Sequence, residues 1–330
     1  MTATAGINGF GRFGLHLLKY WLDRADRAAF SIQYINDARL DRAKALEIIA
    51  SDPYVDFRDY RFETNDDGFT ISGRDGLEQR IVYSNAPTQN EIPWLGSPRL
   101  FLECSGDYTA ASRSRAYLRD STTLVLISAT SWDADATLVY GHNHQTFDRA
   151  KHRVISYGSC TVNGYVPLAD YIEAQYGVID SDVHVVHNVP LYRVGEHKTL
   201  QRKFCTLERS GPLLLPFIDQ NKNFAVIYSI VPWAGTSMID FRFRLRTPPT
   251  REQFFEDFRR AIDPGGRLDG LYGLDQADVG PQALNCTPHS AVIIANGVRM
   301  LGDNLYLQAY FDTENSVNRY FDLTDYLAQQ

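Results

Sequence analysis

The chain has 330 residues, of which 44% are hydrophobic and 22% are charged, and its formal net charge at pH 7 is −7. This composition is that of a folded globular protein and excludes collagen-like, low-complexity and largely disordered classes. The length predicts two domains, and the mildly acidic balance disfavours nucleic acid and anionic membranes as partners, because both bind basic faces.

The cysteines and the hydropathy pattern predict a cytoplasmic protein. The chain has four cysteines, which are Cys104, Cys160, Cys205 and Cys286. They are too few for a disulfide framework and form no C-x-x-C pair, so we expect reduced thiols. No apolar run is long enough to span a bilayer, and the first residues lack the basic start and apolar core of a signal peptide, so we expect no membrane partner. The two histidines of the turn at 141–144 form too weak a ligand pattern to predict a metal.

The first half of the chain predicts a parallel α/β sheet. Residues 4–8 form an extended segment, a glycine-rich turn follows, and Leu15, Leu18 and Leu22 then recur at helical spacing. A second strand at 31–35 makes this a strand–helix–strand unit, which is typical of parallel sheets. Further helices are expected over 41–49 and 110–119, and further strands at 100–103, 123–127 and 154–156.

The second half predicts an antiparallel sheet with helices. Extended runs occupy 183–189, 225–231 and 237–245, and the last of these alternates apolar with polar residues, which marks a strand with one wet face. Helices at 251–261 and 317–327 and a strand at 305–311 complete the order. We therefore expect a Rossmann-type dinucleotide-binding domain over 1–158, with the C-terminal helix 316–330 packed back on it, and an α+β domain over 159–315.

The glycine turn after the first strand predicts a dinucleotide site. The pattern is Gly9-x-Gly11-x-x-Gly14: the first glycine makes the turn, the second admits a pyrophosphate, and the third lets the helix pack on the strand. The helix N-terminus offers free N–H groups to phosphates. Asp37 ends the next strand, where its carboxylate can bind a ribose 2′-hydroxyl and repel a 2′-phosphate, which favours NAD over NADP. The alternative is an ordinary glycine-rich turn.

The segment around Cys160 predicts a nucleophilic thiol. Cys160 lies between a strand and an apolar helix, and a helix N-terminus lowers the pKa of a thiol. The alternative is a buried, inert cysteine, which is also how the other three cysteines are interpreted. A nucleophile needs a base, and two histidines, His184 and His187, lie on one predicted strand three residues apart. They therefore point to opposite faces, and spacing alone does not choose between them.

Several motifs, in the same order along nearly the whole chain, resemble the glyceraldehyde-3-phosphate dehydrogenase family. They are I-N-G-F-G-R-F-G at 7–14, I-N-D at 35–37, E-C-S-G at 103–106, I-S-A at 127–129, S-C-T-V-N at 159–163 and F-D-T-E-N-S-V-N-R at 311–319. The resemblance implies that 159–315 is the catalytic and oligomerisation domain of a homotetramer or homodimer. It also selects His187, which lies 27 residues after Cys160 in a V-H pair, over His184.

The resemblance implies a reaction and a set of site residues. The Cys160 thiolate adds to an aldehyde, the thiohemiacetal passes hydride to NAD, and inorganic phosphate releases the resulting thioester while His187 assists proton transfer. Ser159 and Thr161 flank the nucleophile and can donate hydrogen bonds to phosphate. The implied cofactor-binding residues are Gly9, Phe10, Gly11, Arg12, Phe13, Gly14, Asn36, Asp37, Ser105, Gly106, Ser128 and Thr313.

The departures from the family concern the substrate phosphate. Ile230 stands where the family has an arginine, and Pro190 and Tyr192 stand where it has threonines. The stretch that closes the family's phosphate pocket is replaced by Leu215–Ile218, and we expect the apolar segment 213–218 to line the pocket of a different aldehyde. Thr313 stands where the family has the amide side chain that contacts the cofactor.

Three functional hypotheses follow from these departures. The first is an NAD-dependent aldehyde dehydrogenase of this type with an altered substrate. The second is an ordinary glyceraldehyde-3-phosphate or erythrose-4-phosphate dehydrogenase whose phosphate site is rebuilt. The basic residues available for that purpose are Arg193, Lys198, Arg202 and Lys203. The third is a non-catalytic NAD-binding protein, against which the retained Cys160 and His187 argue.

Overall fold

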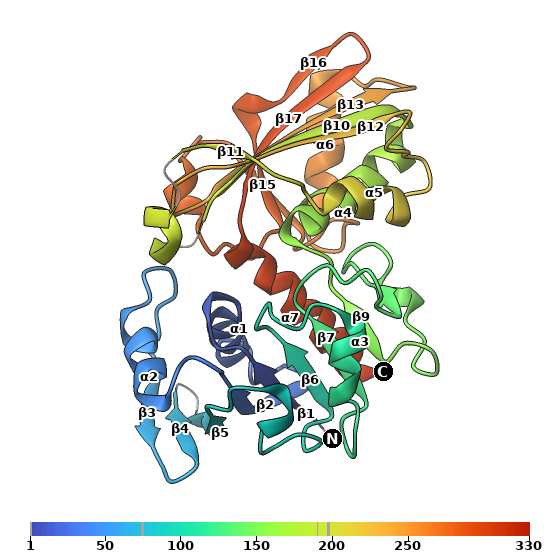
Figure 1. The fold of residues 1–330 in the computed structure, drawn as a ribbon. Helices are drawn as coiled ribbons and strands as arrows, with labels where there is room; N and C mark the ends of the chain where they lie inside the picture. Colours follow the sequence, from blue (N-terminus) through green and yellow to red (C-terminus); the bar gives the residue numbers. More distant parts are fainter. Residues whose placement is uncertain (1, 74–75, 190, 197–198) are drawn as a thin grey trace. The chain divides into compact units, whose positions relative to one another are not determined.

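A computed structural model describes residues 2–73, 76–189, 191–196 and 199–330. The chain divides into two compact units, Met1–Gly158 with Tyr320–Gln330, and Ser159–Arg319 (Figure 1). The division falls between Gly158 and Ser159, one residue before Cys160, and α7 (Thr313–Gln329) begins in the second unit and ends in the first. No helix in the described ranges is long and apolar enough to cross a membrane.

The first unit is built on a mostly parallel sheet of nine strands among the described residues. Their order is β3 (Arg61–Thr64), β4 (Gly68–Ser72), β5 (Glu78–Ser84), β2 (Phe30–Asn36), β1 (Ala3–Asn8), β6 (Leu100–Glu103), β7 (Leu124–Ile127), β9 (Val154–Ser156) and β8 (Ala136–Thr137). Among the described strands of this sheet, only the pairs β3–β4 and β4–β5 are antiparallel, and β5 pairs parallel with β2. The helices are α1 (Arg12–Leu22), α2 (Arg42–Ser51), α3 (Ala111–Ser114), η2 (Gln89–Glu91), η3 (Arg115–Tyr117) and η4 (His144–Thr146).

The strand order creates a crevice beside the glycine turn. Strand β1 lies between β2 and β6, and Asn8 pairs with Asn36 on one side and with Glu103 on the other. The chain leaves β1 toward β2 and returns to β6 on the opposite side, so strand order reverses here. Ligands of open α/β sheets bind at such a point, outside the carboxyl ends of the strands. The predicted Rossmann-type α/β fold is confirmed.

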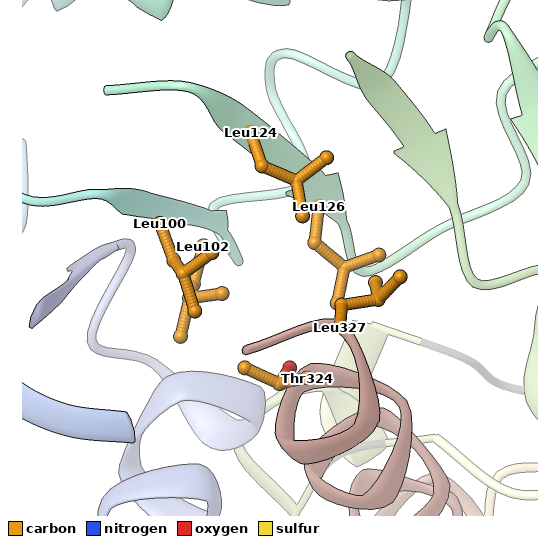
Figure 2. A pocket seen from close by; sticks show the side chains of 6 residues that line it. All are labelled: Leu100, Leu102, Leu124, Leu126, Thr324 and Leu327. Atoms are coloured by element: carbon orange, nitrogen blue, oxygen red, sulfur yellow. The ribbon is translucent and has the colours of Figure 1, made fainter. Parts of the chain in front are cut away.

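The C-terminal part of α7 completes the core of the first unit. Thr324 and Leu327 lie against leucines of β6 and β7, as Figure 2 shows. The Tyr320 hydroxyl donates to the Leu126 carbonyl (2.6 Å), and Arg99 donates to the carbonyl of Ala328 (3.2 Å). This contact is part of the hydrophobic packing of the unit, and the hydroxyl of its one polar residue, Thr324, is used within α7 by donating to the Tyr320 carbonyl (2.7 Å).

The second unit contains an eight-stranded sheet among the described residues. Its order is β11 (Gln201–Arg202), β12 (Phe224–Ile230), β10 (Val178–His187), β13 (Ser237–Leu245), β17 (Asn304–Phe311), β15 (Ala291–Ile294) and β14 (Tyr272–Asp275), and β16 (Arg299–Leu301) pairs with β17. The helices are α4 (Cys160–Tyr176), α5 (Leu207–Leu214), α6 (Arg251–Ile262), η5 (Leu191–Glu196), η6 (Pro281–Leu284) and η7 (Ala295–Gly297).

The two faces of this sheet differ in what covers them. On the covered face, Tyr165 of α4 packs against Phe224, Phe241 and Phe243, with ring centroids 5.3, 6.1 and 5.9 Å away. The residues that alternate with these point to the opposite, outer face, which carries Ile227 and the charged residues of β13. The alternation predicted for 237–245 is therefore confirmed.

Several elements differ from the sequence expectation. Strands β3 to β5 and β14 to β16 and helix α5 were not predicted, and the helix expected over 110–119 is a short α3 followed by η3. Strand β3 consists mainly of charged and polar residues, and most of its side chains are exposed. The edge strand β3 therefore lacks the apolar alternation from which a strand is recognised, whereas β4 and β5 carry alternating buried residues that were overlooked.

Candidate active site

The glycine turn between β1 and α1 leaves space for a ligand. A Cβ on Gly9, whose φ is +96°, would lie 2.4 Å from the backbone of Ser105, and one on Gly14 would lie 2.1 Å from the Gly9 carbonyl oxygen. The fold itself therefore requires these two glycines. A Cβ on Gly11 would meet nothing within 4 Å, and no side-chain hydrogen bond caps α1 there. Gly11 thus leaves an open approach to a helix N-terminus, the environment that a pyrophosphate requires.

Asp37 organises the loop that follows β2. Its Oδ2 accepts from the Phe10 N–H (2.7 Å), and its Oδ1 accepts from the N–H groups of Arg39 (2.7 Å) and Leu40 (2.8 Å). The Phe10 amide is therefore committed to Asp37 rather than to a phosphate. A carboxylate has about four acceptor positions, so one remains for a ribose hydroxyl.

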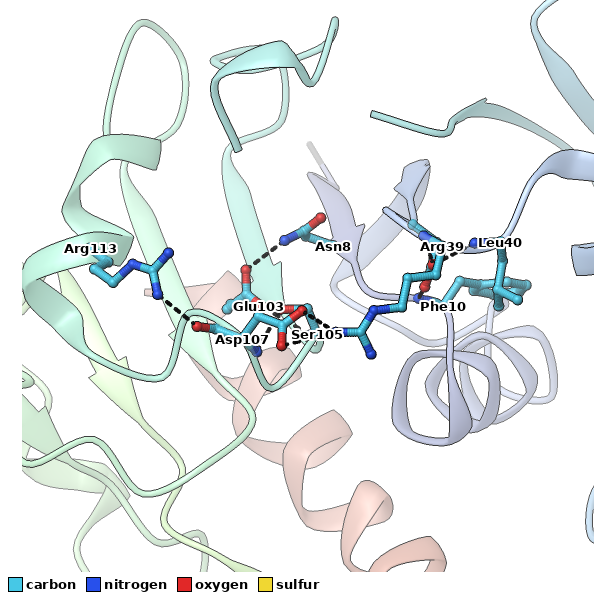
Figure 3. A network of polar contacts seen from close by, with 9 residues as sticks. Asn8, Phe10, Arg39, Leu40, Glu103, Ser105, Asp107 and Arg113 are labelled. Atoms are coloured by element: carbon cyan, nitrogen blue, oxygen red, sulfur yellow. Dashed lines mark hydrogen bonds and ion pairs between the residues drawn. The ribbon is translucent and has the colours of Figure 1, made fainter. Parts of the chain in front are cut away.

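A buried polar network joins the ends of the three central strands. Asn8 donates to Glu103 (2.7 Å) and accepts from Asn36 (2.9 Å), while the Ser105 N–H donates to Glu103 (2.8 Å); Figure 3 shows Asn8, Glu103 and Ser105 together. Burial raises the pKa of Glu103. Asn36 also accepts from the Ala86 N–H (2.9 Å). Its side chain therefore holds the strand ends in place, and any contact with a cofactor is secondary to this role.

The remaining predicted cofactor residues fall in both units. The Phe13 ring packs edge-on against Tyr157 and Tyr320, and its backbone N–H lies on the first turn of α1, beside Arg12. Gly106 has a φ of +75° and open space at its Cβ position, and Ser128 follows β7. Thr313 begins α7 within the second unit, whereas all the others belong to the first.

Cys160 and His187 lie together within the second unit. The Sγ of Cys160, the first residue of α4, is 3.3 Å from Nε2 of His187, the last residue of β10. His187 Nδ1 is 2.9 Å from the carbonyl oxygen of Asn188. Because a carbonyl only accepts, Nδ1 carries the proton and Nε2 presents a lone pair to the thiol. This arrangement can take the thiol proton and keep it nearby.

The other histidine of β10 faces away from this site. His184 is 49% exposed, and its Nδ1 lies 3.8 Å from Asp240 on the outer face of the sheet. The predicted opposition of the two side chains is therefore confirmed, and only His187 reaches Cys160.

Hydroxyl groups form a chain beside Cys160. Ser159 caps α4 by accepting from the Val162 N–H (3.3 Å), and its Oγ also accepts from Thr206 (2.9 Å) and lies 3.1 Å from Thr161 Oγ1. Thr161 Oγ1 is 3.5 Å from the Sγ of Cys205, and burial raises the pKa of that thiol. The site therefore offers several hydroxyl donors next to the nucleophile. Cys205, although it follows a polar sequence, is buried among them.

Strand β12 determines which side chains flank His187. Ile230 pairs directly with His187, and Tyr228 pairs with Val185, so both point to the covered face with the histidine. The Tyr228 ring lies 5.8 Å from the His187 ring, and burial raises the pKa of Tyr228. Strand β12 therefore places an aliphatic side chain and a neutral phenol beside His187.

The basic residues considered as replacements lie elsewhere or outside the described residues. Arg193 donates from Nε to Glu196 (2.9 Å) in the exposed η5 segment. Arg202 pairs with Ser229, so its side chain points to the face opposite to Ile230. The Lys203 N–H donates to the Tyr228 carbonyl (3.1 Å), which extends the pairing of β11 with β12 by one more residue. Lys198 and Pro190 lie outside the described residues, as does the side chain of Tyr192.

The apolar segment expected to line the substrate pocket is not buried as a unit. Leu213 is 73% exposed, whereas Leu215 and Ile218 are buried, and a Cβ added at Gly211 would touch Ile218 and Phe224. The segment therefore begins at the end of α5, and only its later residues Leu215 and Ile218 pack into the core of the second unit. Burial accounts for the apolar pattern at these two residues, and a role of the segment in lining a pocket stays a prediction.

Two residues near Cys160 were missed by sequence reasoning. Thr206 has no motif around it, and Tyr228 lies in an ordinary apolar strand. The one signal in the sequence was that Tyr228 lies two residues before Ile230, because side chains two apart on a strand point to the same face. Among the residues that the structure describes, no three His, Cys or acidic side chains gather where they could hold a metal ion.

Comparisons with known proteins agree with this arrangement. No family model matches the chain. It is 26% identical over 341 residues to glyceraldehyde-3-phosphate dehydrogenase 1 of Bacillus cereus, covering 98% of both chains. It is 26% identical over 350 residues to the glyceraldehyde-3-phosphate dehydrogenase of Streptomyces coelicolor (100% of both), and 28% identical over 331 residues to the chromosomal enzyme of Cupriavidus necator (95% of both). The chain is a divergent relative of the glyceraldehyde-3-phosphate dehydrogenases.

Proposed function

We propose that the protein is an NAD-dependent dehydrogenase that oxidises an aldehyde through Cys160. The observation that carries this proposal is the 3.3 Å contact between Cys160 Sγ at the start of α4 and His187 Nε2. The names of its full-length relatives support the same class of reaction. A non-catalytic NAD-binding protein would have no use for a thiol and an imidazole held in this geometry.

The first unit supplies the residues that would hold NAD. The open approach at Gly11, the uncapped start of α1 and the remaining acceptor position of Asp37 fit a pyrophosphate and an adenosine ribose. When bound, NAD supplies the acceptor for the hydride that leaves the substrate carbon. The carboxylate of Asp37 would repel a 2′-phosphate, so NAD is the preferred form.

The second unit supplies the covalent chemistry. His187 Nε2 takes the thiol proton, and the Cys160 sulfur forms a bond to the aldehyde carbon as the carbonyl π electrons move to oxygen, which takes that proton from His187 to give the thiohemiacetal hydroxyl. His187 then removes the hydroxyl proton of the thiohemiacetal while hydride leaves the carbon, which yields a thioester. An acyl acceptor, inorganic phosphate by analogy with the relatives, displaces the sulfur. Ser159 and Thr161 stand beside the sulfur, where they can donate hydrogen bonds to that acceptor.

The substrate differs from glyceraldehyde 3-phosphate in this proposal. Ile230 pairs with His187 and offers no hydrogen-bond donor, and Arg202 points to the other face of the sheet. Burying a phosphate dianion beside an aliphatic side chain carries a large desolvation cost. The second candidate, a phosphorylated substrate in a rebuilt site, rests on Lys203, whose backbone pairs with Tyr228.

Steady-state kinetics with an aldehyde panel and NAD, with and without phosphate, test this proposal. We expect an unphosphorylated aldehyde to be the better substrate and glyceraldehyde 3-phosphate to be poor. Ile230→Arg should raise kcat/KM for glyceraldehyde 3-phosphate roughly 10- to 100-fold, the value of one charge-assisted hydrogen bond. Ile230→Met is the matched uncharged control and should not.

Two outcomes would contradict the altered substrate. One is efficient turnover of glyceraldehyde 3-phosphate by the wild-type protein that is lost in Lys203→Ala or Arg193→Ala, which would establish a rebuilt phosphate site. The other is an Ile230→Met variant that gains as much as Ile230→Arg. A protein that oxidises no aldehyde in the panel but binds NAD would instead support the non-catalytic alternative.

The assembly and the location follow from the same proposal. We place the protein in the cytoplasm, as a homo-oligomer, because its chemistry uses a reduced thiol and a soluble cofactor. The outer face of the second sheet, with Ile227 and Tyr306 exposed on it, is the surface on which copies would meet.

A further inference from the structure

An ion pair spans the crevice of the first unit. The Arg39 Nη2 lies 3.1 Å from Asp107 Oδ2 and 3.3 Å from Oδ1. Arg39 follows β2 and Asp107 follows β6, the two strands that flank β1, so the pair crosses the carboxyl edge of the sheet next to the glycine turn (Figure 3). The two side chains are 77% and 50% exposed, so they are accessible to a ligand.

Both partners are anchored by their backbones. The Arg39 N–H donates to Asp37 Oδ1 (2.7 Å), which places this residue beside the carboxylate proposed to receive the adenosine ribose. The Asp107 N–H donates to Ser105 Oγ (3.1 Å), and Arg113 donates to the Asp107 carbonyl (3.1 Å). The guanidinium therefore lies next to the ribose site, and both carboxylate oxygens of Asp107 accept from its Nη2 there.

A guanidinium at the end of the second strand is the group that accommodates a ribose 2′-phosphate. Two carboxylates oppose the binding of a 2′-phosphate beside the glycine turn. The Asp37 carboxylate repels the phosphate, and the Asp107 carboxylate pairs with Arg39, which lies two residues after Asp37. Without Asp107, Arg39 would be free to turn its donors toward a 2′-phosphate.

We propose that Asp107 is a cofactor-specificity residue, which withholds Arg39 from a 2′-phosphate and so strengthens the preference for NAD over NADP. This inference rests on the proposed NAD site. Asp107 acts through Arg39, because the pair must be broken before the cation is available. Since exposed ion pairs contribute little, the effect on the ratio of NADP to NAD affinity is about two- to fivefold. It decreases as ionic strength rises, because both groups are in contact with solvent.

Calorimetric titration of the full-length protein with NAD and with NADP tests this inference without requiring turnover. The Asp107→Asn variant should bind NADP about two- to fivefold more tightly relative to NAD than the wild type does at low salt. The double variant Asp107→Asn/Arg39→Ala should lose that gain. Asp67→Asn is the matched control, since it breaks another exposed arginine pair of the same unit, with Arg80, and removes the same charge.

Three outcomes would overturn the inference. An unchanged NADP-to-NAD ratio in Asp107→Asn, with NAD still bound, refutes the role of Asp107. A gain that persists in the double variant shows that Asp107 acts as a distant charge and not through Arg39. A gain of equal size in Asp67→Asn shows a general charge effect. If the wild-type protein binds neither dinucleotide, the proposed function fails, and this inference fails with it.

Discussion

The four cysteines differ in their chemical environments. Burial raises the pKa of Cys104 and of Cys205, so both sulfurs stay protonated near neutral pH. Cys160 is only partly buried, starts a helix and lies 3.3 Å from an imidazole nitrogen. Thiolate character follows from such surroundings rather than from the residue type. The thiols of one chain therefore should separate sharply by reactivity.

Labelling with iodoacetamide at pH 7 should modify Cys160 first. We expect its rate to exceed those of Cys205 and Cys104 by about tenfold or more, because the thiolate is the reacting form. Peptide mass spectrometry over a time course measures the three rates. Cys160→Ser should remove the fast phase and abolish aldehyde oxidation while NAD binding is retained. Faster labelling of Cys205 would show that the nucleophile has been wrongly assigned.

Residue patterns predicted part of the site and could not have predicted the rest. The opposition of His184 and His187 follows from the period of a strand and is confirmed. Which of them faces inward depends on β13 and α4, which are distant in sequence. Tyr228 became visible only through the register between β10 and β12, because pairing partners on separate strands leave no local signal.

At the scale of elements, helix caps connect stability with chemistry. Ser159 caps α4 and also joins the hydroxyl chain beside Cys160, whereas Thr250 caps α6 in a capping box with Gln253 and has no part in the site. Both caps satisfy an otherwise unpaired N–H at a helix start. The two residues therefore form a natural pair for separating folding from function.

Ser159→Ala and Thr250→Ala should each lower the free energy of unfolding by about 1 kcal/mol, because each removes one cap. Only Ser159→Ala should also lower kcat/KM for the aldehyde, since it removes a hydroxyl beside the nucleophile. Urea denaturation and steady-state kinetics on both variants measure the two effects. A loss of activity in Thr250→Ala, or full activity in Ser159→Ala, would contradict the role given to Ser159.

The sequence predicted elements best where burial was regular. Strands β6, β9 and β13 have the predicted boundaries, because each is a short apolar or alternating run. Strand β3 was missed since it lies at the sheet edge with mostly exposed side chains, and α5 was missed since Pro212 interrupts its pattern. The fold class could thus be predicted, whereas the edges and the loop that carries Thr206 could not.

At the scale of the whole molecule, the outer face of the second sheet has the features of a contact surface. A row across this face contains Ile227, His184, Asp240 and Gln308, as the register places them. Ile227 is 58% exposed there, although it lies in the middle of a strand. Apolar groups exposed among charged ones on a sheet face mark protein interfaces.

We expect the protein to be a homo-oligomer that uses this face, and Ile227→Asp should shift it to a smaller species. The substitution places a charge where a second copy would bury an aliphatic side chain, which opposes association. Sedimentation equilibrium over a range of concentrations measures the mass. Leu213→Asp is the matched control, because it makes the same kind of change at an exposed site on α5, which packs against the covered face; its mass should match that of the wild type. A wild-type protein that remains monomeric at the highest concentration would refute the oligomer, and an oligomer unaffected by Ile227→Asp would place the contact elsewhere.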